Sequence, residues 1–196
     1  MSVKINKLCK AFGEHKVLKG LDLTLEDGGV YCLMGASGMG KTTLLHILLG
    51  LESKDSGEIT GIKSGRISAM FQENRLCENL TAAQNVALVC GGKMSIGEIT
   101  KKLSEILPAE CMEQPVSELS GGMKRRAALA RAMLFDSDLV ILDEPFTGLD
   151  SNTKKDVIDF ILRMQNGRIL LISTHGEEDV SLLGGKKIRL DELFTQ

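Results

Sequence analysis

The chain has 196 residues and a net charge of −2, from 24 lysines and arginines against 26 aspartates and glutamates. This balance excludes the overall basic excess by which many proteins attract nucleic acid. With 43% hydrophobic and 26% charged residues, the composition is that of an ordinary soluble globular protein. The length suits one large domain, or a core with a small appended lobe.

Membrane spans, a secretory leader and disulfides are not expected. The longest apolar stretches, such as residues 44–49 with His46 inside, are far too short to cross a bilayer, and charges are spread through residues 1–10. Any link to a membrane is therefore expected to run through a partner protein. Reduced thiols in a cytosolic compartment are expected, because five cysteines occur without a C-x-x-C pair: Cys9, Cys32, Cys77, Cys90 and Cys111.

In chain order, the first predicted elements are strands. Residues 3–8 and 16–25 alternate apolar and polar side chains around a turn at Phe12 and Gly13, which indicates an antiparallel pair with one solvated face. Residues 30–34 are apolar without interruption, as in a strand buried on both faces. A helix that ends at a glycine and two further strands are then expected over residues 42–49, 58–62 and 66–71.

The rest of the chain combines helices with two more apolar strands. Residues 139–142 and 169–173 are unbroken apolar runs, and residues 186–193 predict a last strand and turn. Thr81 is a candidate N-cap for the first of the helices. Helices are expected over residues 79–89, 95–107, from residue 123 onward, 153–162 and 177–182.

Each of the three apolar runs ends in residues that can do chemistry. Strands buried on both faces belong in a parallel sheet with helices on both sides, and open α/β sheets bind ligands at the carboxyl ends of their strands. The first run leads into a glycine-rich loop, the second into Asp143 and Glu144, and the third into Thr174 and His175. The sequence therefore predicts one site assembled from three separated segments.

The glycine-rich loop matches the phosphate-binding pattern G-x-x-x-x-G-K-[ST], with a strand before it and a helix after it as the pattern requires. Its glycines allow torsions that turn successive amide N–H groups toward phosphate oxygens, and the helix N-terminus adds positive potential. Lys41 supplies a charge for the outer phosphates, and the Thr42 hydroxyl can ligate Mg²⁺. An accidental match arises about one time in a hundred in a chain of this length. The predicted phosphate-binding residues are Gly35, Ala36, Ser37, Gly38, Met39, Gly40, Lys41, Thr42 and Thr43.

The two acidic residues after the second apolar run are candidates for metal binding and catalysis. Burying the Asp143 carboxylate is costly without a cation, and Mg²⁺ held by Thr42 and nucleotide phosphates supplies one. Glu144 is expected to point elsewhere because side chains alternate along a strand, and to activate a water for attack on the terminal phosphate. A histidine on its own is more often packed or on the surface, but the position of His175 favours contact with that phosphate.

Taken together, these residues resemble the ATP-binding-cassette (ABC) ATPases over nearly the whole chain. Six motifs in the family's order carry the resemblance: the phosphate loop, Gln72 as the Q-loop glutamine, residues 119–123 (Leu-Ser-Gly-Gly-Met) as the signature motif, residues 139–145 as Walker B with its catalytic glutamate, residues 148–150 as the D-loop, and His175 as the switch histidine. Met123 replaces the more usual glutamine, and the segment 72–119 is shorter than the family norm.

The resemblance implies an α/β fold with a P-loop NTPase (RecA-like) core around a mainly parallel sheet, an N-terminal antiparallel β subdomain and a short α-helical subdomain. Residues 1–196 would form a single ABC ATPase domain, with 1–78 and 119–196 as core and about 79–118 as the helical subdomain. ATP and Mg²⁺ are the implied cofactors. The implied roles are catalysis by Glu144, His175 and Gln72, contact with the nucleotide base by Phe12 and Val17, and metal ligation by Thr42, Gln72 and Asp143.

The signature motif predicts a second anion site. A serine and two glycines before a helix offer a hydroxyl, open backbone and a helix N-terminus, although an ordinary helix cap would explain the tripeptide alone. In the family this site grips the ATP of a partner subunit in a head-to-tail dimer. The residues expected to act in trans are Ser120, Gly121, Gly122 and Asp150.

The implied function is ATP hydrolysis that energises a separate membrane permease, most similar to the nitrate, sulfonate and taurine importers. The implied partners are permease subunits, a second copy or a paired ABC subunit, and a solute-binding protein, with no nucleic acid. The implied location is the cytoplasmic face of the inner membrane. Two alternatives stay open: a nucleotide-gated scaffold of the cell-division or lipoprotein-release type, and a soluble ABC ATPase without a transport role.

A basic cluster follows the signature motif. It consists of Lys124, Arg125, Arg126 and Arg131. No aromatic residues are interleaved with these cations, as they are in many single-stranded nucleic-acid sites. The favoured interpretation is a solvated helix face near the anionic nucleotide.

Overall fold

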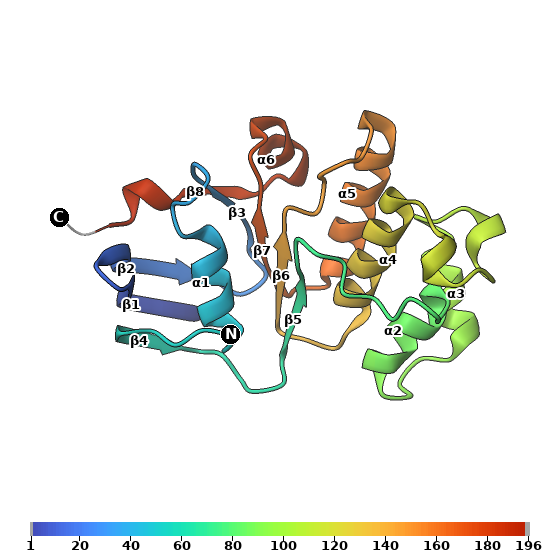
Figure 1. Cartoon of the computed structure of the whole chain (residues 1–196), viewed down its shortest axis with the longest axis horizontal. Coiled ribbons are helices and arrows are strands. Elements are labelled where there is room, and N and C mark those ends of the chain that lie inside the picture. The colour runs from blue at the N-terminus through green and yellow to red at the C-terminus, as the bar shows by residue number, and fades with distance from the viewer. Residues whose placement is uncertain (1, 195–196) are drawn as a thin grey trace.

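A computed structural model describes residues 2–194 and contains two sheets (Figure 1). The antiparallel sheet has the strand order β2-β1-β4 and consists of β1 (Val3–Phe12), β2 (His15–Leu25) and β4 (Ser56–Thr60). The second sheet is parallel in every strand pair and has the order β5-β6-β7-β3-β8. Its strands are β3 (Val30–Met34), β5 (Ile67–Met70), β6 (Leu139–Asp143), β7 (Ile169–Ser173) and β8 (Lys186–Arg189).

Helices lie on both sides of the parallel sheet, as Figure 1 shows. On one side α1 (Lys41–Leu48) shares a hydrophobic core with both sheets. On the other side are α4 (Gly121–Leu134) and α5 (Ser151–Gln165), with α2 (Ala82–Cys90) and α3 (Ile96–Leu103) packed beyond α4 and α6 (Glu177–Leu183) after β7. Short 3₁₀ turns lie at Ala109–Cys111, Val116–Glu118 and Leu190–Glu192. None of the helices within residues 2–194 combines the length and the apolar character that a bilayer crossing requires.

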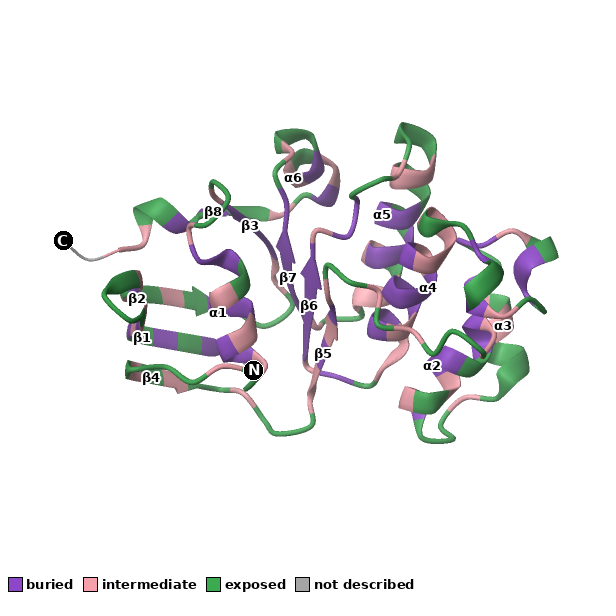
Figure 2. Cartoon of the chain, in the orientation of Figure 1, coloured by how far each residue is buried: buried purple, intermediate pink, exposed green. Residues whose placement is uncertain are grey.

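The parallel sheet is buried on both faces, which confirms the prediction from the apolar runs. Along β6, Leu139 and Ile141 pack into the core that contains α1 and the antiparallel sheet. The intervening Val140 and Leu142 pack into the core that contains α4 and α5, and Figure 2 shows these central strands as fully buried. Because α2 and α3 contribute to that second core, the proposed boundaries of a helical subdomain at 79 and 118 stay a prediction.

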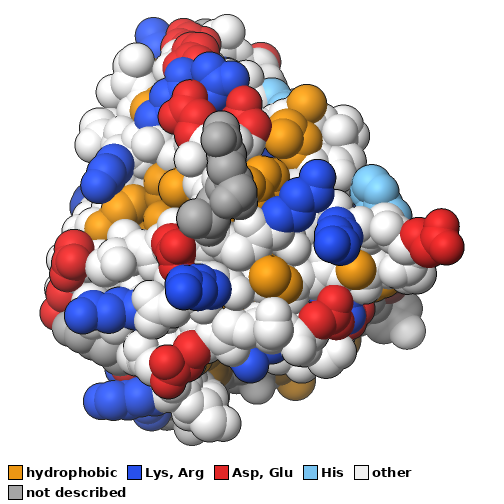
Figure 3. Space-filling model, turned by 90° about the vertical axis from the view of Figure 1, so that its left-hand side faces the viewer, with side chains coloured by type: hydrophobic (Ala, Val, Ile, Leu, Met, Phe, Trp, Pro, Cys, Tyr) orange, Lys and Arg blue, Asp and Glu red, His pale blue; other side chains and the backbone are white. Residues whose placement is uncertain are grey.

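The antiparallel pair at the N-terminus has one buried and one solvated face, as predicted. A bulge at Lys7, whose φ is +48°, shifts the register of β1 against β2 between Ile5 and Leu8. The side chains of Ile5 and Leu8 are therefore both buried, although they lie three positions apart. Figure 3 shows basic and acidic side chains interspersed over the outer face of the molecule at this end.

The differences from the predicted elements lie at the ends of strands and helices. Strand β1 runs four residues past the predicted end, and β4 lies two residues before the predicted range 58–62. Helix α3 ends at Leu103, four residues before the predicted end, and the Ser104 hydroxyl donates to the Lys101 carbonyl at 2.8 Å where the turn begins. Helix α5 starts two residues earlier than predicted, because the Asp150 carboxylate caps it and accepts from the N–H groups of Asn152 at 3.0 Å and Thr153 at 3.1 Å. The prediction of Thr81 as the cap of α2 is confirmed.

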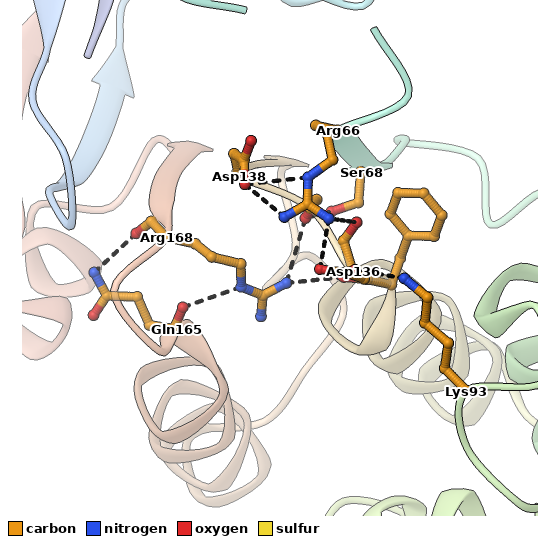
Figure 4. A network of polar contacts seen from close by, with 9 residues as sticks. Arg66, Ser68, Lys93, Asp136, Asp138, Gln165 and Arg168 are labelled. Carbon is orange, nitrogen blue, oxygen red and sulfur yellow. Dashed lines mark hydrogen bonds and ion pairs between the residues drawn. The ribbon is translucent and has the colours of Figure 1, made fainter. Parts of the chain in front are cut away.

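A polar network fastens the edge of the parallel sheet at which β5, β6 and β7 begin (Figure 4). Arg66 pairs with Asp138 at 2.6 Å (Nη2–Oδ1) and with Asp136 at 2.8 Å (Nη1–Oδ1). Arg168 donates to the Met133 carbonyl at 2.8 Å and so holds the end of α4 beside the start of β7. These residues stabilise the edge opposite the predicted site, and no sequence pattern had indicated the network.

Candidate functional site

The three predicted segments meet at one edge of the parallel sheet. Strands β6, β7 and β3 are neighbours, so their carboxyl ends lie side by side. Asp143 at the end of β6 is in register with Ser173 at the end of β7. The next residue, Thr174, donates its N–H to the Leu33 carbonyl of β3 at 3.2 Å. The glycine-rich loop, the acidic pair and the histidine therefore start from adjacent positions.

The glycine-rich loop has the backbone that the phosphate-binding pattern requires. Gly35, Gly38 and Gly40 have φ values of +155°, +81° and +97°, which side chains disfavour. A Cβ at Gly40 would also lie 2.6 Å from Cγ1 of Val17, so only glycine fits this close approach of β2. Lys41 is buried, and its Nζ donates to the Gly35 carbonyl at 2.6 Å, across the loop.

The remaining phosphate-loop residues line the start of α1. Ala36, Ser37 and Thr42 are exposed, whereas Met39 and Thr43 are half-buried. The first turn of α1 carries no acidic side chain, so its positive N-terminal end is not neutralised from within the turn. An anion that approaches this loop meets backbone N–H groups, a helix N-terminus and one lysine.

Asp143 and Glu144 are held by the hydroxyl of Ser173, a residue that the sequence analysis did not single out. The buried Asp143 carboxylate accepts a hydrogen bond from Ser173 Oγ at 2.5 Å. The same oxygen accepts from the N–H of Glu144 at 2.8 Å. Glu144 itself has φ +50°, so the prediction that strand alternation aims its side chain is wrong: β6 has already ended, and the left-handed backbone sets the direction.

Glu144 and His175 are in direct contact and together line part of a small cavity. Oε1 of Glu144 lies 2.7 Å from Nε2 of His175, and Oε2 accepts from the Thr147 hydroxyl at 3.3 Å. The cavity has a volume of about 230 Å³ and is lined by Glu144, Phe146, Thr147, Lys154, Thr174, His175, Gly176 and Asp179. A carboxylate and an imidazole at this distance can share or transfer a proton.

The loop that carries His175 is anchored by Asp179, another residue that the sequence analysis missed. Asp179 is buried, accepts a hydrogen bond from the Thr174 hydroxyl and pairs with Lys154 Nζ of α5 at 2.9 Å. The hydrogen bond that Lys154 donates to the Asp179 carboxylate raises the pKa of Lys154. This ion pair connects the histidine loop to α5, the helix capped by Asp150.

Gly176→Ala is expected to disturb this anchor. The φ of Gly176 is −91°, so backbone strain does not require glycine, but an added Cβ would lie 2.8 Å from Asp179 Oδ2 and 3.0 Å from its Cγ. We expect a loss of about 1–3 kcal/mol in the free energy of unfolding, measured by denaturant titration. The matched control is Gly97→Ala in α3, where nothing lies within 4 Å; it should change stability by less than about 1 kcal/mol. Equal effects of the two alanines would contradict the anchor.

A protein-family model described as "ABC transporter" matches residues 18–147. This chain belongs to the ABC transporter family. The predicted family is therefore confirmed, and the match runs from β2 through the phosphate loop to the residues that follow Glu144.

Individual relatives agree with this assignment. An aliphatic sulfonates import ATP-binding protein of Nocardia farcinica is 35% identical over 97% of this chain and 78% of its own length. A sulfate/thiosulfate import ATP-binding protein of Methylococcus capsulatus is 33% identical over 91% of this chain, which spans 57% of that relative's length. A lipoprotein-releasing system ATP-binding protein of Porphyromonas gingivalis is 34% identical over 91% of each chain.

Solved structures confirm the predicted fold class. The dimeric bacterial ABC transporter cassette MJ0796 has a TM-score of 0.83 to this chain at 25% identity, with 96% of this chain and 94% of that one covered. A Pyrococcus furiosus protein named as an ABC transporter ATP-binding protein has a TM-score of 0.85 at 26% identity, with all of both chains covered.

The other ABC motifs lie on the elements next to the strand ends. Gln72 is exposed just after β5, and Ser120 caps α4 by accepting from the Met123 N–H at 3.2 Å. Gly121 and Gly122 begin that helix, and an added Cβ at Gly122 would lie 3.9 Å from Leu149 of the D-loop. The signature motif and the D-loop therefore lie close together within one chain.

The adenine contact expected of Phe12 stays untested by the structure, whereas the solvated face expected of the basic cluster is not found. Phe12 is half-exposed at the end of β1, with Lys10 Nζ 4.9 Å from its ring centre, and its contact with adenine stays a prediction. The prediction that the basic cluster forms a solvated helix face is wrong, because Arg125 is buried and Arg126 and Arg131 donate to main-chain carbonyls. Periodicity alone did not show that loops cover this side of α4.

Proposed function

We propose that this ABC protein binds ATP with Mg²⁺, hydrolyses it, and energises a separate membrane permease as the ATP-binding subunit of an importer. The observation that supports this most is the meeting of the phosphate loop, Asp143–Glu144 and Thr174–His175 at one edge of the parallel sheet. Three relatives are named as ATP-binding proteins, two of them in import systems.

In this proposal different groups of the chain bind the phosphates and activate the attacking water. The N–H groups of the phosphate loop and Lys41 hold the β- and γ-phosphates. Glu144 takes a proton from the water that attacks the γ-phosphate, and His175, 2.7 Å from Glu144, hydrogen-bonds the same phosphate. General-base assistance is worth about 10²–10⁴ in rate. Gln72, exposed just after β5, the strand next to β6, would contact the water or the metal.

The residues present fit Mg²⁺ that is bound together with a nucleotide. Thr42, Asp143 and Gln72 offer hydroxyl, carboxylate and amide oxygens, the hard donors that Mg²⁺ prefers. Within residues 2–194 no group of three or more His, Cys, Asp or Glu residues is arranged to hold a metal ion by itself, which suits an ion that takes further ligands from phosphates. Mg²⁺ would neutralise charge on the β- and γ-phosphates.

We also propose that two copies sandwich two nucleotides. Ser120, Gly121, Gly122 and Asp150 would then contact the ATP of the partner. The relative MJ0796 was solved as a dimer, and also in a post-hydrolysis state bound to ADP and Pi. The complex would sit on the cytoplasmic face of the inner membrane, with permease subunits and, in an import system, a solute-binding protein.

The lipoprotein-releasing relative supports a second candidate function. It matches this chain over 91% of both lengths, whereas the first sulfate/thiosulfate relative extends well beyond the match. A role in lipoprotein release, or as a nucleotide-gated scaffold, is therefore the alternative. Reconstitution with each candidate permease distinguishes them, because only the true partner should stimulate ATP hydrolysis.

The basic proposal is tested with the purified chain, ATP and Mg²⁺. We expect ATP binding by calorimetry, and phosphate release whose rate per molecule rises with protein concentration, because each site needs residues from two copies. Removal of Mg²⁺ with EDTA should abolish hydrolysis. A chain that binds no ATP·Mg²⁺ would end the proposal.

A further inference from the structure

Arg125 is buried where the Q-loop and the acidic strand end approach each other. Only 6% of the residue is exposed. Its Nη1 donates to the carbonyls of Phe71 at 3.0 Å and Gln72 at 2.6 Å. Its Nη2 donates to the carbonyls of Asp143 at 2.8 Å and Glu144 at 2.5 Å. One side chain on α4 therefore bonds the main chain of two separate functional segments.

Within residues 2–194 this arginine makes no ion pair and is held by the four main-chain carbonyls and, at 3.3 Å, by the amide oxygen of Asn74. Its Nε has no hydrogen-bond partner there. Burial lowers the pKa of Arg125, while the nearby charges of Asp143 and Glu144 raise it. Burying a charge is costly unless its hydrogen bonds are made. A planar fork with several N–H donors can join four carbonyls from two loops, which a lysine cannot do with one nitrogen.

Glu144 depends on this contact more than an ordinary residue would. Its φ of +50° is uncommon for a residue with a side chain, and such conformations persist where surrounding contacts enforce them. Ser173 Oγ accepts from its N–H, and Arg125 donates to its carbonyl. The backbone of Glu144 is therefore held on both sides, and the direction of its carboxylate follows.

The Q-loop is held by the same helix through a second arginine. Arg131 donates to the carbonyl of Asn74 at 3.1 Å and of Arg75 at 2.7 Å. Arg75 in turn stacks over the Phe71 ring at 3.9 Å. The loop from Phe71 to Arg75 contains no helix or strand, so contacts with α4 determine its path.

We propose that Arg125 is a positioning residue that sets Gln72 and Glu144 relative to each other and to the signature helix. The inference rests on the proposed function, since it concerns the hydrolysis of ATP. A shift of α4, whose N-terminus is the signature motif, would carry the Gln72 and Glu144 carbonyls with it. Arg125 thus links the helix that begins at the signature motif to the hydrolytic groups of its own chain.

The first test compares Arg125→Lys and Arg125→Gln with Arg126→Lys. Arg126 is the control, because it lies one residue further along α4 and donates to the Gly122 and Ile106 carbonyls instead. We expect the Arg125 variants to lower kcat about 10- to 100-fold with KM within about 3-fold. The control should keep kcat within about 2-fold. Unchanged kcat in folded Arg125→Lys would overturn the proposal.

Two further readouts distinguish positioning from general stability. Amide hydrogen exchange should speed up in segments 71–75 and 144–147 of Arg125→Lys, but not in the Arg126→Lys control. The double variant with Gln72→Ala should lose less kcat than the product of the two single losses, because Arg125 acts in part through Gln72. The proposal would be contradicted if the double variant lost kcat by the full product of the two single losses. It would also be contradicted if amide exchange in the two segments were unchanged in Arg125→Lys.

The outcomes also separate this proposal from the function on which it rests. If the wild-type chain fails to bind and hydrolyse ATP, the proposed function fails. Hydrogen exchange then still tests whether Arg125 holds segments 71–75 and 144–147. If the wild type hydrolyses ATP and Arg125→Lys does so equally well, only the positioning role fails. If neither Arg125 variant folds, the role of Arg125 is structural and the positioning proposal is overturned.

Discussion

The Glu144→Gln variant is expected to bind ATP and hydrolyse it about 10²–10⁴-fold more slowly than the wild-type chain. The amide keeps the size of the side chain and can still contact His175, whose Nε2 lies 2.7 Å from Oε1 in the wild type. It cannot take a proton from the attacking water. Steady-state phosphate release gives kcat, and titration with a fluorescent ATP analogue gives the affinity, which should change less than about 3-fold.

The same variant should accumulate as a dimer in ATP and Mg²⁺, because the sandwiched nucleotides are not hydrolysed. Size exclusion with light scattering measures this directly. Glu113→Gln is a matched control, because Glu113 is an exposed carboxylate in the segment before α4 and no role is proposed for it. Near-normal turnover by Glu144→Gln would remove Glu144 from the base role, and a monomeric variant would weaken the sandwich proposal.

The sequence predicted the centre of the fold well, for a physical reason. A strand buried on both faces must be apolar at every position, so the three apolar runs were recognisable without any contact information. Parallel strands place their carboxyl ends on one edge, so the residues after those runs had to be neighbours. The adjacency of Asp143 and Ser173 bears this out.

The contacts that hold the site could not be predicted in this way. Lys124, Arg125 and Arg126 are adjacent cations in the sequence, yet only Arg125 is buried, since a loop from β5 and the end of β6 meet over that side of α4. Ser173 and Asp179 are common polar residues whose partners lie 30 and 5 positions away. Such pairings depend on how the strand ends are arranged in space, which no periodicity encodes.

Lys41→Met is expected to weaken ATP binding about 10- to 100-fold. Hydrogen bonds that involve charged groups contribute about 1.5–3 kcal/mol each, and each 1.4 kcal/mol is a tenfold change in affinity. Lys41 is 7% exposed, and its Nζ donates to the Gly35 carbonyl at 2.6 Å and to the Ala36 carbonyl at 3.3 Å. The ammonium group therefore already lies within the loop, where the outer phosphates would bind.

Methionine is chosen because it keeps most of the buried aliphatic part of the lysine side chain and removes only the hydrogen-bond donors and the charge. The free energy of unfolding should fall by about 1.5–3 kcal/mol, because the shorter of the two loop hydrogen bonds has a charged donor. Calorimetric titration with ATP·Mg²⁺ measures the affinity, and Lys19→Met, an exposed lysine in β2, is the control for loss of one positive charge. If both variants bound ATP as well as the wild type does, the phosphate loop would not be the nucleotide site. If both lost affinity equally, net charge rather than the position of Lys41 would explain the loss.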